Sequence, residues 1–248
     1  MPFPSIMPEN PAEIPASDQS RPLARRRFLR YSGAGLAAGG LWLAGCAKDK
    51  DEITPSSRLD VGSGDTGILN FAYALEQLEA AFYAQVVAGP YFAGASAAEK
   101  DVLRDLRDHE AIHAAFFKNL LGSNAIRDLT PDFSNIDFAQ RTTAQSASRL
   151  GVLNAARAFE DLGVAAYNGV GRYIVRNDYL LLAGKIVSVE ARHAAIIREL
   201  ITANTFVASD VVDTTNNGLE KSKRPQDVLT IANTFLAEGS KLSALNFK

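Results

Sequence analysis

The chain has 248 residues, of which 47% are hydrophobic and 22% are charged, so it is long enough to bury a sizeable core. Without the first 45 residues, which resemble an export signal, 21 basic and 25 acidic residues remain, a net charge of −4. This mild acidity gives no reason to expect nucleic acid as a partner. The single cysteine, Cys46, excludes an internal disulfide and a thiolate metal site.

The N-terminal segment has its parts in the order of an export signal. Residues 25–30, RRRFLR, match the twin-arginine pattern, and the apolar run Tyr31–Ala44 is too short to span a bilayer comfortably. The run closes with Leu43–Cys46, which looks like a lipobox. We therefore expect residues 1–45 to be a twin-arginine signal peptide and Cys46 to become a lipid anchor, which places the protein in the periplasm at a membrane. The alternative is a basic patch before a buried apolar helix.

Residues 46–64 are charged and rich in Ser, Gly and Asp, which is typical of a flexible tether. Helical spacing of apolar residues, together with start and stop signals, then predicts five helices, at about residues 66–87, 96–121, 138–168, 177–203 and 225–238. Asp65 is placed to cap the first helix, and Ser96–Glu99 is a capping box for the second.

The links between these helices predict the topology. Residues 123–136 contain Pro131 and several turn formers, and they are long enough to cross a helix bundle. No segment has a convincing alternating strand pattern. The sequence therefore predicts an all-α fold, with two helical hairpins over residues 65–205 joined by a crossover link. A C-terminal extension, residues 206–248, adds one short helix.

Two Glu-x-x-His pairs, Glu110–His113 and Glu190–His193, lie within the predicted helices and use two of the three histidines in the chain. Residues three apart share a face of a helix, so each pair can offer a carboxylate and an imidazole to one metal ion. A single such pair is usually a solvated surface feature. Its duplication predicts two half-sites that face each other inside a bundle.

The other two long helices repeat a second pattern, in which a glutamate is followed by a tyrosine seven residues later. Glu76 precedes Tyr83 in the first helix, and Glu160 precedes Tyr167 in the third. Seven residues are nearly two helical turns, so each tyrosine shares the face of its glutamate. Glu79 competes with Glu76 as the inward carboxylate, and the internal repeat favours Glu76 because the counterpart of Glu79 is a glycine, Gly163.

Together these patterns predict a metal site of four carboxylates and two imidazoles, formed by Glu76, Glu110, His113, Glu160, Glu190 and His193. A ligand set rich in oxygen and free of thiolate favours dinuclear iron or manganese over structural zinc. Tyr83 and Tyr167 are the candidate catalytic side chains, although tyrosines in such places more often hydrogen-bond a buried carboxylate.

Three segments also resemble a known family. Leu75–Tyr83, Glu160–Gly169 and Glu190–Ala195 are similar to the ferritin-like domain of exported bacterial proteins related to desiccation-related proteins, over about residues 66–204. The wider superfamily, which includes bacterioferritin and rubrerythrin, implies a four-helix bundle and a di-iron site. By this resemblance the six residues above are the ligands, and Glu110 and Glu190 bridge the two ions.

The resemblance also indicates a departure. Bacterioferritins commonly place an acidic residue before each paired glutamate, where it orients the opposite ligand histidine. In this chain these positions hold His109 and Val189, which argues against fast ferroxidase chemistry. His109 is equally well read as a surface residue, and Arg192 within the second pair is expected to point outward.

Three functions fit these features. The first is a redox protein whose iron or manganese centre reacts with oxygen, peroxide or Fe(II). The second is a non-catalytic envelope protein for stress or desiccation protection that keeps the fold. The third is iron storage. It is the weakest of the three hypotheses, because a lipid anchor and a long tether fit poorly with a closed soluble cage.

Overall fold

The computed structural model describes residues 58–145 and 147–247. The predicted signal, Cys46 and most of the predicted tether therefore lie outside the described residues. The described part is mostly helical, with six α-helices: α2 (Gly64–Ala88), α3 (Pro90–Gly94), α4 (Ala97–Leu121), α5 (Val152–Val170), α6 (Asn177–Ile201) and α7 (Pro225–Ala232). None of the helices in these residues is long and apolar enough to cross a membrane.

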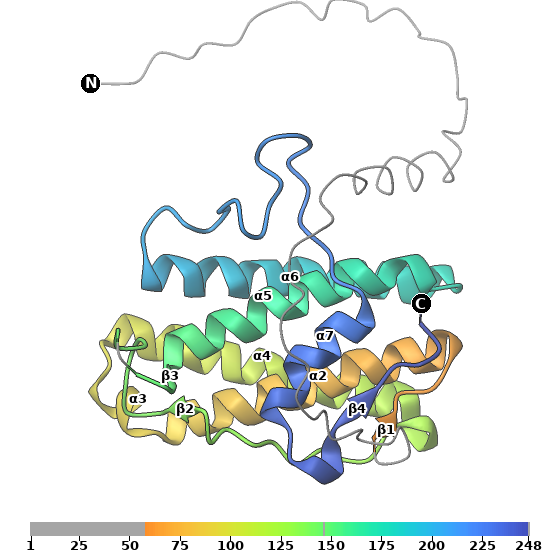
Figure 1. Ribbon diagram of the computed structural model, residues 1–248, viewed down its shortest axis with the longest axis horizontal. Helices are drawn as coiled ribbons and strands as arrows, with labels where there is room; N and C mark the ends of the chain where they lie inside the picture. The colour runs from red at the N-terminus through yellow and green to blue at the C-terminus, as the bar shows by residue number, and fades with distance from the viewer. Residues whose placement is uncertain (1–57, 146, 248) are drawn as a thin grey trace, which may run out of the picture. The chain divides into compact units, whose positions relative to one another are not determined.

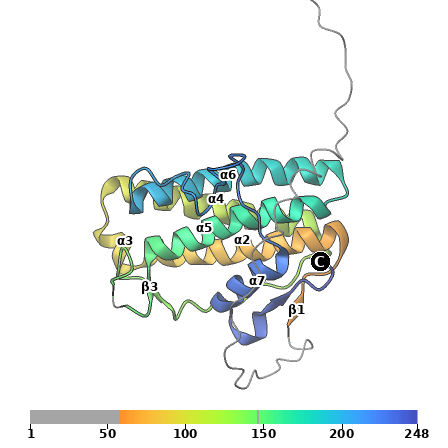
Figure 2. The same cartoon turned by 45° about the horizontal axis from the view of Figure 1, so that its top comes forward.

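The four long helices pack as two hairpins, α2 with α4 and α5 with α6, and short α7 follows them (Figures 1 and 2). The start of α4 matches its sequence signal, because the Ser96 hydroxyl accepts a hydrogen bond from the Glu99 backbone N–H at 3.2 Å. Its end is set by Gly122, whose φ of +53° only glycine adopts readily. The all-α prediction is confirmed.

The described strands are four two-residue pieces, too short to give a sequence pattern. They form two parallel pairs: β1 (Leu59–Asp60) with β4 (Leu242–Ser243), and β2 (Ile136–Asp137) with β3 (Leu150–Gly151). The first pair ties the start of the described chain to its C-terminal end, and the second lies in the link between the hairpins.

The prediction that the third helix starts near residue 138 is wrong, because α5 begins at Val152. The link between the hairpins is therefore longer than expected and runs the length of the bundle (Figure 1). Side chains satisfy its backbone locally: Thr143 accepts a hydrogen bond from the Gly151 N–H, and Asn154 accepts one from the Thr143 N–H. Short polar side chains of this kind compete with helix formation.

Asp65 does not cap α2 as expected. It lies inside the first turn, and the residue at the N-cap is Ser63. The Asp65 carboxylate instead accepts the backbone N–H groups of Val175 and Arg176, at 2.8 and 3.0 Å. It therefore fastens the start of α2 to the turn between α5 and α6.

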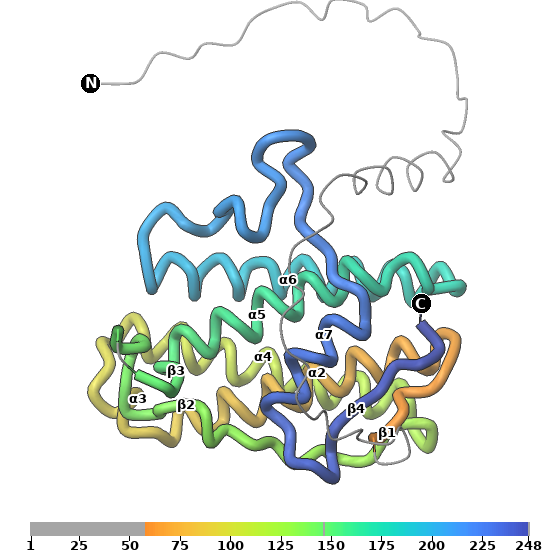
Figure 3. The backbone as a smooth tube through the Cα atoms, in the orientation of Figure 1, coloured from red at the N-terminus to blue at the C-terminus, as the bar shows by residue number. Residues whose placement is uncertain are grey.

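The C-terminal segment returns to the bundle after the long excursion 202–224, which Figure 3 traces from the end of α6 to α7. Helix α7 ends at Ala232, six residues earlier than predicted, and a 3₁₀ turn, Asn233–Phe235, follows. Buried Asn233 accepts a hydrogen bond from the Leu242 N–H at 2.7 Å and donates one to the Leu242 carbonyl at 3.0 Å. This exchange ties β4 to the residue that follows α7.

Helices α2 and α5 are the central pair of the bundle. Both are buried around most of their circumference, whereas α4 and α6 each keep an exposed face. Aromatic side chains fill one end of the core, where Phe82 contacts Phe159, Phe133 and Phe138 at ring-centroid distances of 4.9 to 6.0 Å. Any polar group on the inward faces of the central helices is therefore enclosed by protein.

Gly169 and Gly184 form a matched pair for testing this packing. A Cβ on Gly169 would collide with the backbone of Lys223, whereas one on Gly184 meets nothing within 4 Å. We expect Gly169→Ala to lower the free energy of unfolding by about 1–3 kcal/mol through overpacking. Gly184→Ala should raise it by about 0.5–1 kcal/mol, because alanine favours helix. Urea denaturation of both variants measures the difference, and equal stabilisation by both would contradict the close approach at Gly169.

Candidate metal centre

The six residues predicted as ligands come together between the hairpins, and all four long helices contribute. Glu76 comes from α2 and Glu160 from α5, while α4 and α6 each supply a Glu-x-x-His pair. All four carboxylates are at most 1% exposed. Carboxylates are almost never this buried without a compensating partner, so the cluster requires cations, protons or a metal.

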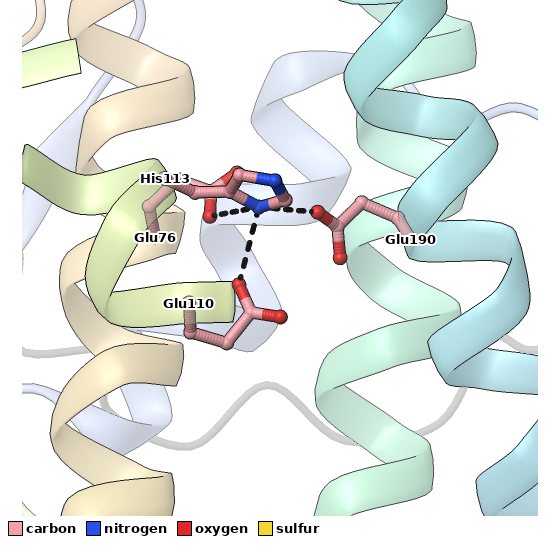
Figure 4. Close-up of side chains that lie close together, drawn as sticks. All are labelled: Glu76, Glu110, His113 and Glu190. Atoms are coloured by element: carbon pink, nitrogen blue, oxygen red, sulfur yellow. Dashed lines mark ion pairs between the residues drawn. The ribbon is translucent and has the colours of Figure 1, made fainter. Parts of the chain in front are cut away.

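The first half of the cluster surrounds His113. Its Nδ1 lies 2.8 Å from Glu190, 3.4 Å from Glu76 and 3.7 Å from Glu110, measured to the nearest carboxylate oxygen (Figure 4). The three carboxylates come from three different helices, and the imidazole nitrogen faces the point between them. These four residues form one group that could hold a metal ion.

The second half surrounds His193 in the same way. Its Nδ1 lies 2.8 Å from Glu110, 3.2 Å from Glu190 and 3.6 Å from Glu160. The four residues form a second group that could hold a metal ion, and within each group the ligand atoms lie within 4.8 Å of one another. Glu110 and Glu190 belong to both groups, so the two potential metal positions share two carboxylates.

Many of these polar atoms are buried without a hydrogen bond. Six of the nine such side-chain atoms in the described residues belong to the cluster: Glu76 Oε2, Glu110 Oε1 and Oε2, His113 Nδ1, Glu160 Oε2 and Glu190 Oε1. All six instead take part in His–Glu ion pairs, at separations of 2.8 to 3.7 Å. Buried polar atoms that converge on two common points fit bound cations, and the cluster is consistent with a dimetal site.

Each of the two tyrosines forms a hydrogen bond with a glutamate of the opposite hairpin, the one that is not part of a Glu-x-x-His pair. Tyr83 on α2 donates its hydroxyl hydrogen to Glu160 on α5 at 2.5 Å, and Tyr167 on α5 donates to Glu76 on α2. Both tyrosines are buried. Each therefore orients the glutamate of the other hairpin rather than the one on its own helix.

The carboxylates and imidazoles shift one another's pKa values strongly. Burial lowers the pKa of both histidines, but contacts with the surrounding carboxylates outweigh it and raise the pKa of His113 and of His193 to about 12. Burial also raises the pKa of Glu160 to about 8 and that of Glu76 well above its usual range. In the metal-free protein at neutral pH, both histidines and Glu160 therefore carry protons, and Glu76 holds a proton more readily than an ordinary carboxylate.

Glu79 is a fifth buried carboxylate beside the cluster. It is 4% exposed, and the space where Gly163 would carry a Cβ lies 3.2 Å from one of its oxygens. Burial, and then repulsion by Glu110 and Glu160, raise the pKa of Glu79 well above its usual range. Glu79 belongs to neither ligand group, which agrees with the choice of Glu76 from the internal repeat.

Sequence patterns did not predict the contact that His109 makes with the cluster. His109 is exposed overall, yet its Nδ1 lies 2.9 Å from His193 Nε2. The two rings are stacked at a centroid distance of 5.2 Å. The sequence feature that points to this contact is the position of His109 directly before Glu110. Val189, in the equivalent place before Glu190, carries no polar group, and Arg192 is exposed as expected.

The model of the ferritin-like domain family matches residues 64–203, which span all four long helices and all six clustered residues. The chain belongs to the ferritin-like domain family. A search of curated proteins found no significant match. The predicted four-helix fold is thus confirmed for this ferritin-like domain. Its buried cluster lies where the two hairpins of the domain meet.

The protonation of the site predicts that metal binding releases protons. His113, His193 and Glu160 are protonated in the metal-free protein at neutral pH and must lose those protons to act as ligands. Because lower pH favours the protonated forms, apparent affinity should rise as pH increases from 6 to 7.5, about tenfold per unit for each proton released. Calorimetric titration in buffers of different ionisation enthalpy counts the protons. Uptake with no proton release would contradict the assigned protonation.

Proposed function

We propose that this protein binds a dinuclear iron or manganese centre and acts as an oxidoreductase towards oxygen, peroxide or Fe(II). The observation that carries the proposal is the pair of overlapping ligand groups that share Glu110 and Glu190. Carboxylates common to both groups would place two ions side by side, as in the dinuclear carboxylate centres of helical bundles. The oxygen-rich ligand set, with one imidazole per position, favours iron or manganese.

The residues of the chain have distinct tasks in this proposal. Glu110 and Glu190 belong to both ligand groups and would help to hold both ions, while Glu76 with His113 and Glu160 with His193 would each complete one group. Two bound ions would supply the one-electron oxidation and reduction steps that reaction with oxygen or peroxide requires. The surrounding core excludes bulk water from these side chains.

Tyr83 and Tyr167 act in this proposal through the glutamates that they hold. Each hydroxyl donates to one oxygen of Glu160 or Glu76, which leaves the other oxygen free to face the metal position. Such outer partners fix the orientation of a ligand carboxylate. The predicted catalytic role of the tyrosines thus becomes a more specific one, in which they position ligands.

We further propose that the ferritin-like domain is exported and tethered to a membrane. The support comes from the sequence alone: the twin-arginine pattern at residues 25–30, the apolar run after it and the lipobox ending at Cys46. The resemblance to exported desiccation-related proteins agrees with this location. A dinuclear centre there would meet oxidants that arrive from outside the cytoplasm.

The first test is metal content. The full chain, purified from its native export route, is expected to carry about two metal ions per chain, measured by inductively coupled plasma mass spectrometry. The Glu110→Ala plus Glu190→Ala variant should remain helical by circular dichroism and lose nearly all of this metal, because both positions share those carboxylates. Fewer than about one metal ion per chain in the wild type would refute the dinuclear centre.

A buried carboxylate outside the ligand groups provides the matched control. Glu79→Gln removes a charge beside the cluster and is expected to leave metal content unchanged, whereas Glu76→Gln should lower it. If metal is bound, absorbance changes on adding Fe(II) with oxygen, or peroxide, then test for turnover. Full metal without any such change would favour a non-catalytic envelope protein.

The tyrosines give a separate prediction. Tyr83→Phe and Tyr167→Phe remove one hydroxyl each and keep the ring that packs in the core. We expect each variant to stay folded and to weaken metal binding about 10–100-fold, because the glutamate loses the group that orients it. Metal titrations monitored by absorption measure this. Unchanged affinity combined with lost oxidation would instead assign the tyrosines a direct redox role.

A further inference from the structure

His109 stands at the edge of the bundle on α4, one residue before Glu110. Its side chain reaches across to the other hairpin and stacks on His193 of α6, with the two rings inclined by 18°. The 2.9 Å separation between His109 Nδ1 and His193 Nε2 is that of a hydrogen bond. The imidazole of a residue outside the ligand set is thus in direct contact with a proposed ligand.

The direction of this hydrogen bond follows from the orientation of His193. Its Nδ1 faces the carboxylates of Glu110, Glu190 and Glu160, so Nε2 is the nitrogen that points away from the cluster. An imidazole that binds a metal through Nδ1 carries its proton on Nε2. With a metal on Nδ1, His193 would therefore donate its Nε2–H, and His109 would accept it at Nδ1.

The other half of the site has no such support. His113 also presents Nδ1 to its carboxylates, and its Nε2 contacts no hydrogen-bonding group among the described residues. In the second hairpin the residue that corresponds to His109 is Val189, directly before Glu190, and its aliphatic side chain cannot accept a hydrogen bond. The two halves of the cluster share ligand types but differ in what holds the histidine.

We propose that His109 is a positioning residue, which fixes the orientation and tautomer of His193 and thereby makes the two metal positions unequal. The position formed by Glu110, Glu160, Glu190 and His193 binds metal first and more tightly, and the His113 position binds second. This inference rests on the proposed dinuclear centre. Outer partners of a ligand histidine typically contribute 10–100-fold to metal affinity, so the effect is large enough to measure.

The test is a cobalt(II) titration of the metal-free full chain, followed by visible absorption and calorimetry. Wild type should bind in two steps of different affinity. His109→Leu removes the acceptor and should weaken the tighter step by about tenfold or more while leaving the weaker step within about twofold. His109→Asn places an amide oxygen near the former Nδ1 and should retain the tighter step. Asp108→Asn, an exposed neighbour, is the matched control.

A second measurement reads the hydrogen bond itself. In the zinc-loaded, ¹⁵N-histidine-labelled chain, the Nε2–H proton of His193 should be protected from exchange with water in wild type and in His109→Asn. It should exchange rapidly in His109→Leu. A merely structural role for His109 would weaken both cobalt steps together and would not separate the leucine variant from the asparagine variant.

The measurements distinguish a failure of the role of His109 from a failure of the dinuclear centre. If wild type takes up two cobalt ions and His109→Leu binds both as wild type does, the inference about His109 is overturned and the dinuclear centre stands. If both steps weaken equally in the leucine and asparagine variants, the positioning role is also overturned. A wild-type chain that takes up no cobalt overturns the proposed function and the inference together.

Discussion

The rest of this structure depends on the burial of acidic side chains inside a helical bundle. Five carboxylates and an imidazole are at most 4% exposed at the centre of the domain, and a second imidazole is only slightly more accessible. A buried ion is tolerated when it is paired, protonated or bound to metal. Without metal, the histidines carry protons and face the carboxylates, so protons occupy the places that cations would take. The arrangement of the cluster and the packing of the core therefore depend on each other.

The shortest contacts of the cluster all connect the two hairpins. His113 of the first hairpin lies 2.8 Å from Glu190 of the second, and His193 of the second lies 2.8 Å from Glu110 of the first. The tyrosine–glutamate hydrogen bonds cross the same boundary, whereas the bulk of helix packing lies within each hairpin. Any cation bound there would fasten the hairpins to each other, so that ligand binding and closure of the bundle are linked.

Sequence periodicity predicted the four long helices and the six residues that meet between them, because both follow from which residues share a helical face. It could not predict the start of α5, since residues 138–151 satisfy their backbone through side chains such as Thr143 and Asn154. Nor could it show that each tyrosine holds the glutamate of the opposite hairpin. Spacing along one helix shows which residues share a face. Only the packing of the two hairpins determines which groups on those faces touch each other.

The two halves of the internal repeat differ at two places near the site, and both differences make the halves of the site unlike. Glu79 lies opposite Gly163, so one central helix adds a buried carboxylate of raised pKa where the other leaves space for it. His109 contacts a ligand histidine, whereas Val189 offers no acceptor. Symmetric ligands alone would give two equivalent positions with equal affinity. In the proposed dinuclear centre, asymmetric surroundings would give the two positions different affinities and different access to protons, so the chemistry of each ion would depend on residues that do not bind it.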